Sequence, residues 1–158
     1  MNYTSYNSGV PIITNKLARR EYEILSTFTA GLLLTGPEVK SLRLGQASLR
    51  GSHVKIIGTE AFLLNAQITP YRFASQKELE PKRTRKLLLK RRELDRLIGA
   101  SQEKGRTLVP LAFKTGRTIK LEIGIGRGKK QHEKREELKR REQRREVERT
   151  IRGRLRGF

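Results

Sequence analysis

The sequence of 158 residues contains no cysteine and only two histidines. Without cysteine the chain cannot form disulfide bonds, use a thiolate in catalysis or bind zinc through thiolates, and a reducing cytoplasm suits it. No apolar run approaches the ~20 residues that a helix needs to cross a bilayer. The first residues, MNYTSYNSGV, lack a basic start followed by an apolar run, so we expect no signal peptide.

The charge of the chain is strongly one-sided. Lysine and arginine number 36 against 16 aspartates and glutamates, which gives a formal net charge of +20 and a pI near 11.1. Such an excess repels itself in the compact state unless a polyanion neutralises it, and nucleic acid presents the densest line of phosphates. Hydrophobic residues make up only 35%, so we expect one domain with appendages. A basic protein without a specific partner is the plainer alternative.

The positive charge is concentrated in the second half of the chain. Residues 1–80 hold nine basic and six acidic side chains, residues 81–128 fourteen and four, and residues 129–158 thirteen and six. Residues 1–14 are polar and predict a flexible N-terminal arm. Residues 15–128 carry the hydrophobic patterns of a folded domain, and the remainder predicts a basic C-terminal tail.

Three segments of this domain alternate in the manner of β-strands. Residues 15–35 predict strand structure, and residues 52–68 predict a hairpin that turns at Gly58-Thr59-Glu60. Residues 107–126 predict two more strands around Thr115-Gly116-Arg117. The last of these should have one wet face, because four apolar residues alternate with polar ones: Ile119, Leu121, Ile123 and Ile125.

Two further segments predict helices. Residues 35–46 hold Pro37, which suits the first helical turn. Residues 84–99 predict a helix between a Thr84 cap and a Gly99 stop, with one apolar face: Leu87, Leu94 and Ile98. With about six short strands and no βαβ rhythm, the chain predicts a mainly β fold with flanking helices, a small six-stranded closed barrel of the oligonucleotide-binding kind (OB-like).

The second face of the predicted helix 84–99 is strongly basic: Arg85, Lys86, Lys90, Arg91, Arg92 and Arg96. Only Glu93 and Asp95 oppose these charges. Neighbouring like charges cost stability unless phosphates offset them, so we favour RNA contact over a merely solvated face.

No arrangement of residues indicates an enzyme. His53 shares a strand face with Lys55, as a half-exposed strand residue would, and His132 lies among lysines. No acid pair, nucleophile motif, metal-ligand spacing or phosphate loop is present. The stretch GIGRG (Gly124–Gly128) resembles a dinucleotide loop only superficially, because it lacks the final glycine and the βαβ setting. We interpret it as a flexible hinge before the tail.

Residues 129–158 combine helix propensity with almost no apolar face. A spacing of four would place three acid–base pairs on a helix: Glu136–Arg140, Glu137–Arg141 and Glu148–Arg152. The few apolar residues form a thin stripe with one residue roughly opposite: Val147, Ile151 and Leu155, with Leu138 opposite. We expect such a tail to be disordered when free and helical in a phosphate-rich groove. There His132 either stacks on a base or is an incidental exposed histidine.

Four stretches resemble one protein family. They are NKLARREYEI (15–24), AGLLLTGPEVKSLRLG (30–45), RTRKLLLKRREL (83–94) and GRGKKQHEKR (126–135). In this order they resemble the SsrA-binding protein family, SmpB, whose members are partners of transfer-messenger RNA. The resemblance implies a six-stranded OB-like barrel and a cytoplasmic protein that is monomeric when free. It implies neither enzymatic activity, nor a cofactor, nor a metal.

The resemblance also implies a mechanism in bacterial trans-translation. The barrel would grip the tRNA-like domain of transfer-messenger RNA at its elbow and D-loop, and deliver it to a stalled ribosome. The tail would enter the vacant decoding centre and mRNA channel and become helical there. Synthesis would resume on the RNA's own reading frame, which tags the product for proteolysis. A structural ribosomal RNA-binding protein with an OB-like barrel is the alternative of a different class.

Carried over by position, the resemblance implies two groups of site residues. The group that grips transfer-messenger RNA comprises Lys16, Arg19, Arg20, Lys40, Arg43, Arg83, Arg85, Lys86, Leu88 and Lys90. The decoding-site group in the tail comprises Lys129, Lys130, Gln131, His132, Lys134 and Arg135. His132 matches a family histidine thought to stack on a base of small-subunit ribosomal RNA, which favours the stacking interpretation.

Four positions depart from the family's usual pattern. Thr29 stands where many members have an acidic residue, and Arg20 where many have histidine. Lys90 stands where asparagine or histidine is usual, and Glu133 where aspartate is usual. A lysine at position 90 favours a phosphate contact over a directed hydrogen bond.

Overall fold

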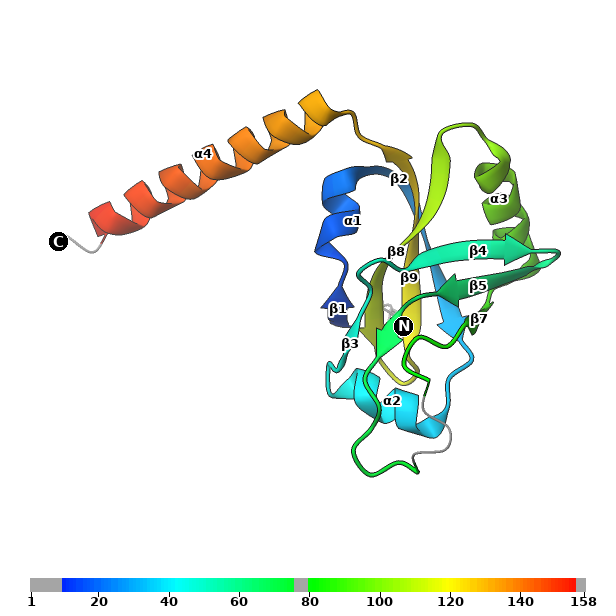
Figure 1. Cartoon of the computed structure of the whole chain (residues 1–158). Helices are drawn as coiled ribbons and strands as arrows, with labels where there is room; N and C mark the ends of the chain where they lie inside the picture. The colour runs from blue at the N-terminus through cyan, green and yellow to red at the C-terminus, as the bar shows by residue number, and fades with distance from the viewer. Residues whose placement is uncertain (1–9, 76–79, 156–158) are drawn as a thin grey trace, which may run out of the picture. The chain divides into compact units, whose positions relative to one another are not determined.

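The computed structural model describes residues 10–75 and 80–155. The chain divides into two compact units, Met1–Gly128 and Lys129–Phe158. We call the described residues of the first unit the body and those of the second unit the tail (Figure 1). The predicted arm lies partly outside the described residues, because residues 1–9 are not among them.

The body is built on one large antiparallel sheet. Seven strands pair in the order β1-β8-β9-β2-β7-β5-β4, and β3 pairs separately with β6. The seven are β1 (Val10–Thr14), β2 (Tyr22–Leu32), β4 (His53–Ile57), β5 (Glu60–Leu64), β7 (Arg85–Leu88), β8 (Arg106–Thr115) and β9 (Lys120–Gly128). The short pair is β3 (Ala47–Ser48) and β6 (Gln67–Ile68). The prediction of a mainly β fold with flanking helices is confirmed.

The prediction of a six-stranded closed barrel is wrong. Within the described residues, the edge strands β1 and β4 have no hydrogen-bonded pairing with each other, so the sheet stays open. In Figure 1 the hairpin β4–β5 crosses the long strands β2, β8 and β9. The sheet therefore coils strongly without closing.

Three helices accompany this sheet: α1 (Lys16–Glu21), α2 (Gly36–Arg43) and α3 (Arg91–Gln102). α1 and β1 were not predicted, because residues 10–14 were assigned to a loose arm and residues 15–35 to strand. The Asn15 side chain starts a helix at this point and ties it to β8. Its Oδ1 accepts from the Ala18 N–H at 3.2 Å and starts α1, and its Nδ2 donates to the Pro110 carbonyl at 3.0 Å.

The predicted helix over residues 84–99 is wrong in its first half. Residues 85–88 form β7, which pairs with β2 and β5, and the helix begins at Arg91. Along β7, Arg85 and Leu87 are buried while Leu88 is exposed, so the pattern has the strand period of two. Pairing on both sides outweighs the helix propensity of this leucine-rich run. Gly99 lies inside α3 instead of ending it.

Other local predictions are confirmed. The hairpins β4–β5 and β8–β9 turn where glycine was expected, and Gly58 has a φ of 62°. α2 holds Pro37 in its first turn, and its Leu42 side chain is fully buried. The four apolar residues that alternate in the last hairpin are all buried in the core: Ile119, Leu121, Ile123 and Ile125. The other face of β9 is only partly exposed, because Gly124 and Gly126 are buried.

The expected hinge at Gly124–Gly128 is instead part of β9, paired with β2 on one side and β8 on the other. A Cβ added at Gly124 would lie 2.9 Å from Leu111 Cδ1 and 3.1 Å from Ile24 Cγ2. Glycine is required at this position because neighbouring side chains approach the backbone closely.

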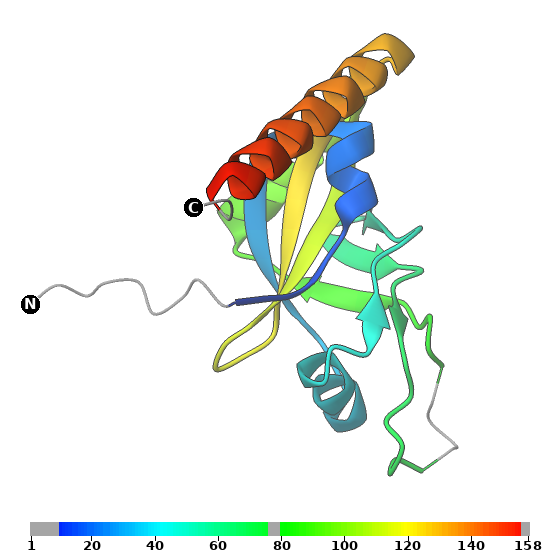
Figure 2. The same ribbon diagram turned by 90° about the vertical axis from the view of Figure 1, so that its left-hand side faces the viewer.

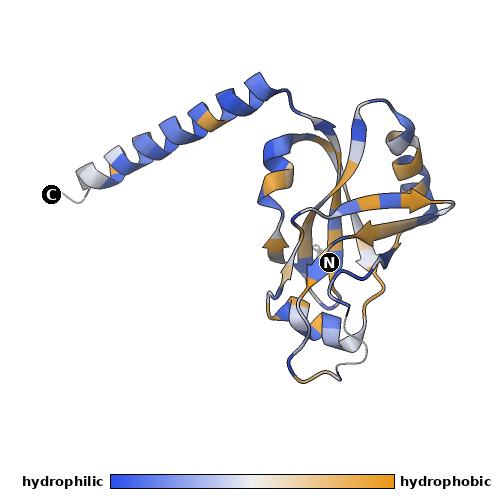
Figure 3. Ribbon diagram, viewed as in Figure 1, coloured by the Kyte–Doolittle hydropathy of each residue, from blue (hydrophilic) through white to orange (hydrophobic). Residues whose placement is uncertain are grey.

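The tail forms one long helix, α4 (Gln131–Leu155). Figure 3 colours it hydrophilic along most of its length, whereas the body's strands carry much hydrophobic colour. Three of its apolar side chains are exposed: Leu138, Val147 and Ile151. None of the helices in the described ranges is long and apolar enough to cross a membrane.

Candidate RNA-binding surfaces

Helix α2 presents two of the predicted RNA-binding cations. The helix starts where the Thr35 N–H donates to Glu38 Oε2 at 2.9 Å, and its buried Leu42 fixes the opposite face to the core. Lys40 and Arg43 are exposed as a result. Figure 2 shows α2 and the β8–β9 turn at the same end of the body, and Arg43 Nη2 donates to the Arg117 carbonyl at 3.4 Å.

A buried ionic cluster joins α2 to β7. Arg83 Nη2 lies 2.6 Å from Glu38 Oε2, and Arg85 Nε donates to Glu38 Oε1 at 2.9 Å. Burial alone would raise the pKa of Glu38. Hydrogen bonds from Arg83 and the Thr35 N–H and the charge of Arg85 lower the pKa, and together they outweigh the effect of burial. The net pKa lies below the usual 4.5, so the carboxylate stays ionised at neutral pH.

Arg85 is a structural residue, which corrects its assignment to the RNA-gripping group. Its side chain is fully buried, and its guanidinium donates to three backbone carbonyls: Ala66 at 2.8 Å, Arg83 at 2.8 Å and Pro81 at 3.1 Å. Burial lowers the pKa of Arg85, the Glu38 charge opposes this, and guanidinium remains protonated. A group with no exposed surface cannot touch RNA, so Arg85 acts by fixing the segments around it.

Other predicted residues of this region are accessible. Leu88 is 51% exposed and packs over Gly31 of β2, where an added Cβ would lie 3.3 Å from Leu88 Cβ. Lys86 forms an ion pair with Glu60, and Lys90 is exposed at the start of α3, where its N–H donates to Glu93 Oε2 at 2.9 Å. The helix prediction was wrong, but Lys86 and Lys90, which it placed on the basic face, are accessible.

Helix α1 carries the three remaining cations of the predicted group, and all of them are exposed: Lys16, Arg19 and Arg20. Arg19 Nη2 lies 3.9 Å from Glu122 Oε2, and Glu122 also accepts from Lys114 Nζ at 2.9 Å. Thr29 pairs across the sheet with the same Glu122. An acidic group is thus present on β9 beside the position where β2 has threonine.

The predicted cations do not form one patch. The ionic cluster around Glu38 links the α2 cations to the segment that leads into β7. Figures 1 and 2 both place α1 and α2 toward opposite ends of the long strands. The body therefore offers cations at two ends of an elongated face, which suits a long polyanion better than a small one.

Two aromatic residues beside α2 were not predicted from the sequence. Tyr71 and Phe73 lie in the connection between β6 and β7, and Phe73 is 79% exposed. Their rings meet edge to face with centroids 5.7 Å apart. The alternation of aromatic and basic residues in Tyr71-Arg72-Phe73 was the available signal.

In the tail, the predicted decoding-site residues surround the start of α4. The Lys130 N–H donates to Glu133 Oε2 at 3.1 Å, and Lys129 Nζ binds Glu137. This hydrogen bond, with smaller contributions from nearby charges, holds the pKa of Glu137 below its usual 4.5. Glu133 thereby stabilises the helix start, while His132 and Arg135 are exposed. In the described part of the chain, no three acidic or histidine side chains gather where they could hold a metal ion.

Comparisons with known proteins agree with this arrangement. The family model described as SmpB protein matches residues 12–153. The SsrA-binding protein of Caulobacter vibrioides is 51% identical over 128 residues, which cover 80% of this chain and 84% of that relative. The SsrA-binding protein of Rubrobacter xylanophilus is 46% identical over 144 residues, covering 90% and 95%.

A solved structure is also similar. It is described as "tmRNA-SmpB: a journey to the center of the bacterial ribosome", and one of its chains matches with a TM-score of 0.65 and 44% identity. The match covers 77% of this chain and 87% of that chain. Sequence and structure agree over most of the length, and this chain belongs to the SmpB family.

Proposed function

We propose that this protein is an RNA-binding adaptor that binds the tRNA-like domain of transfer-messenger RNA and delivers it to stalled ribosomes in trans-translation. The observation that carries the proposal is membership of the SmpB family over residues 12–153. Relatives are named for binding SsrA, and the similar solved chain comes from a structure described by tmRNA, SmpB and the ribosome.

The two units divide the work. The body grips transfer-messenger RNA through its exposed cations and Leu88. The tail enters the decoding centre and the mRNA channel of the small subunit, where His132 stacks on a ribosomal base. The cations at the start of α4 neutralise phosphates around it. The tail is disordered in the free protein and becomes helical on the ribosome, because its apolar residues are too few to hold it on a core.

The protein acts by binding, without catalysis, and works as a monomer in the cytoplasm. Its family is defined by RNA binding, and its exposed charged groups are mostly cations that suit phosphate contact. The open coiled sheet of the body serves as the OB-like platform, because its long strands present side chains on an extended surface.

A pull-down with the full chain from a bacterial lysate, followed by sequencing of the retained RNA, tests the proposed partner. We expect transfer-messenger RNA to be strongly enriched over ribosomal RNA. Equal recovery of the protein on every ribosome, without enrichment of transfer-messenger RNA, would instead identify a structural ribosomal protein.

A chain ending at Gly128 tests the division of work. We expect it to keep its affinity for transfer-messenger RNA and to lose peptide tagging on stalled ribosomes. His132→Ala should weaken tagging in the same way with RNA affinity unchanged, and Gln143→Ala, farther along α4, is the matched control. Loss of RNA binding as complete as the loss of tagging would contradict the division.

A further inference from the structure

The loop beside α2 exposes an aromatic surface that the predicted site does not include. Phe73 is 79% exposed, more than any other large hydrophobic residue in the described part of the chain. Its ring meets that of Tyr71 at 5.7 Å with an interplanar angle of 64°. A ring left in water at this level makes no contribution to the core, which suggests that it has a partner.

Two cations flank these rings. Lys40 Nζ of α2 lies 5.2 Å from the centroid of the Tyr71 ring, and Arg72 Cζ lies 5.8 Å from that of Phe73. Both distances suit a cation–π contact, which leaves the outer edges of the charged groups free for further hydrogen bonds. We call Lys40, Tyr71, Arg72 and Phe73 the aromatic loop patch.

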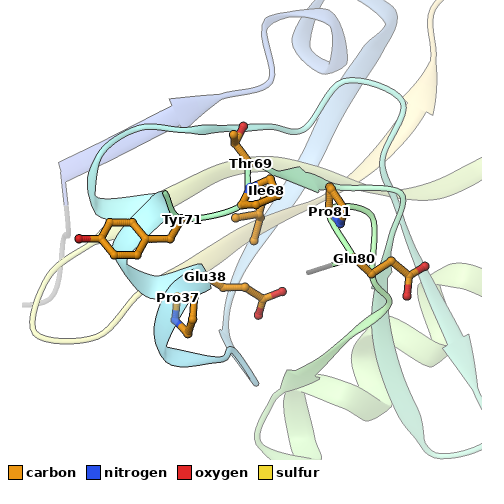
Figure 4. A pocket seen from close by; sticks show the side chains of 8 residues that line it. Pro37, Glu38, Ile68, Thr69, Tyr71, Glu80 and Pro81 are labelled. Carbon is orange, nitrogen blue, oxygen red and sulfur yellow. The ribbon is translucent and has the colours of Figure 1, made fainter. Parts of the chain in front are cut away.

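The patch has a firm base. The Thr69 N–H donates to the Gln46 carbonyl at 2.9 Å, and the Ala74 N–H donates to the Tyr71 carbonyl at 2.9 Å. Figure 4 shows Tyr71 beside a small pocket, with Pro37 of α2 near it and Pro81 on the far side. The loop is therefore anchored where it leaves the body at Thr69, and it turns tightly after Tyr71.

The charges around the aromatic loop patch indicate the class of molecule that it binds. Residues 69–75 and the stretch of α2 after Glu38 contain no acidic residue. Two acidic residues, Glu38 and Glu80, line the small pocket beside Tyr71, and Glu38 is held by Arg83 and Arg85. Exposed aromatic rings beside cations match the way proteins bind unpaired nucleotides, whose bases stack on rings while their phosphates meet lysine and arginine.

We propose that the aromatic loop patch is a stacking site for an unpaired RNA base, with Phe73 under the base and Lys40 and Arg72 at its neighbouring phosphates. Paired bases inside a duplex have no free face, so the site selects a loop or a flipped-out nucleotide. The proposal rests on the proposed function for its partner class, RNA. The base comes from transfer-messenger RNA or from ribosomal RNA, and these two sources are separable by experiment.

The test compares Phe73→Leu with Phe73→Tyr in the full chain. Leucine keeps an apolar side chain but removes the ring, whereas tyrosine keeps it. Binding is measured separately to transcribed transfer-messenger RNA and to ribosomes stalled on a truncated mRNA. For whichever of the two RNAs supplies the stacked base, Phe73→Leu should weaken binding about 5- to 100-fold, and Phe73→Tyr should bind like the parent. Leu25→Ala, an exposed apolar position on β2, is the matched control.

Salt dependence and fluorescence sharpen the test. Phe73→Leu should leave the salt dependence of binding unchanged. Lys40→Ala should reduce the slope of log affinity against log salt concentration by about one, which corresponds to one phosphate contact. A short unstructured RNA that contains 2-aminopurine should lose fluorescence on the parent chain and not on Phe73→Leu. This readout needs no transfer-messenger RNA, so it separates failure of the stacking site from failure of the proposed function. Unchanged affinity of Phe73→Leu in both arms, or equal losses for leucine and tyrosine, would overturn the proposal.

Discussion

The body and the tail have similar ratios of basic to acidic residues, but the body has a buried core and the tail exposes apolar side chains. Residues 1–128, which include the body, hold twenty-three basic and ten acidic residues, and residues 129–158 hold thirteen and six, so the ratios of basic to acidic residues are nearly equal. In the body, apolar side chains between these charges face a shared core, and Leu63, Phe113 and Ile123 are fully buried. In the tail, Leu138 and Ile151 remain exposed. The spacing of apolar residues, more than the amount of charge, decides which segment folds on itself.

The ion pairs of the two units differ in the same way. Glu38 joins Arg83 and Arg85, which are far from it in the sequence, and Arg85 has no exposed surface. In the tail, Glu137 binds Lys129, only eight residues away, and the Glu137 side chain is 45% exposed. Buried pairs hold distant segments together, whereas exposed local pairs contribute a few tenths of a kcal/mol to a helix.

The largest expected effect follows from removing Arg85. Arg85→Ala takes one charge from the Glu38 cluster and leaves three backbone carbonyls without their donor, so the free energy of unfolding should fall by about 3 kcal/mol. Urea unfolding monitored by far-UV circular dichroism measures it. Arg140→Ala, an exposed arginine of α4, should change that value by less than about 0.5 kcal/mol. Equal effects of the two variants would erase the contrast between body and tail.

The next largest loss of stability should come from a substitution of Gly124 in β9. Gly124→Ala should destabilise the body by about 1–3 kcal/mol, because the new methyl group would press on Leu111 and Ile24. Gly99→Ala in α3 is the control, since nothing lies within 4 Å of its added Cβ. That control should be neutral or stabilise by up to about 1 kcal/mol. A tolerated Gly124→Ala would restore the hinge interpretation of this segment.

The pH dependence of stability should come partly from Glu38. Its pKa is lower in the folded body than the 4.5 of the unfolded chain, so its stabilising contribution is complete above that value and is lost as pH falls through the folded pKa. Urea midpoints measured from pH 7 down to acid pH should fall more steeply for the parent than for Glu38→Gln. Glu146→Gln in the tail should retain the parent's slope.

The smallest effect concerns the helix of the tail. Gly153→Ala meets no neighbouring atom and should favour helix by up to about 1 kcal/mol. We expect a modest gain of helical circular dichroism in the free protein and an unchanged urea midpoint for the body. A shifted midpoint would mean that α4 stabilises the body, which would contradict the separation of the two units.

Sequence patterns predicted the elements that depend on local chemistry. Glycine at the β4–β5 turn, Pro37 at the start of α2 and the alternation along β9 each act through neighbouring residues, and all three predictions are confirmed. The family motifs are likewise local, and the family that they resemble is confirmed.

Elements that depend on distant partners were missed. The run from Arg85 to Lys90 has strong helix formers, and only its pairing with β2 and β5 turns the first half into a strand. The burial of Arg85 follows from that pairing and from Glu38, so no pattern within the run could show it. Phe73 was missed for a different reason, because composition cannot reveal which aromatic ring stays in water.

The Glu38 cluster has a consequence for how this family can vary. One carboxylate serves two arginines on a separate segment, so a change of Glu38 leaves the fully buried charge of Arg85 without an acidic counterpart. Substitutions at position 38 should therefore be accompanied by changes at position 85 among relatives, whereas the exposed positions of α4 outside the decoding-site group should vary independently.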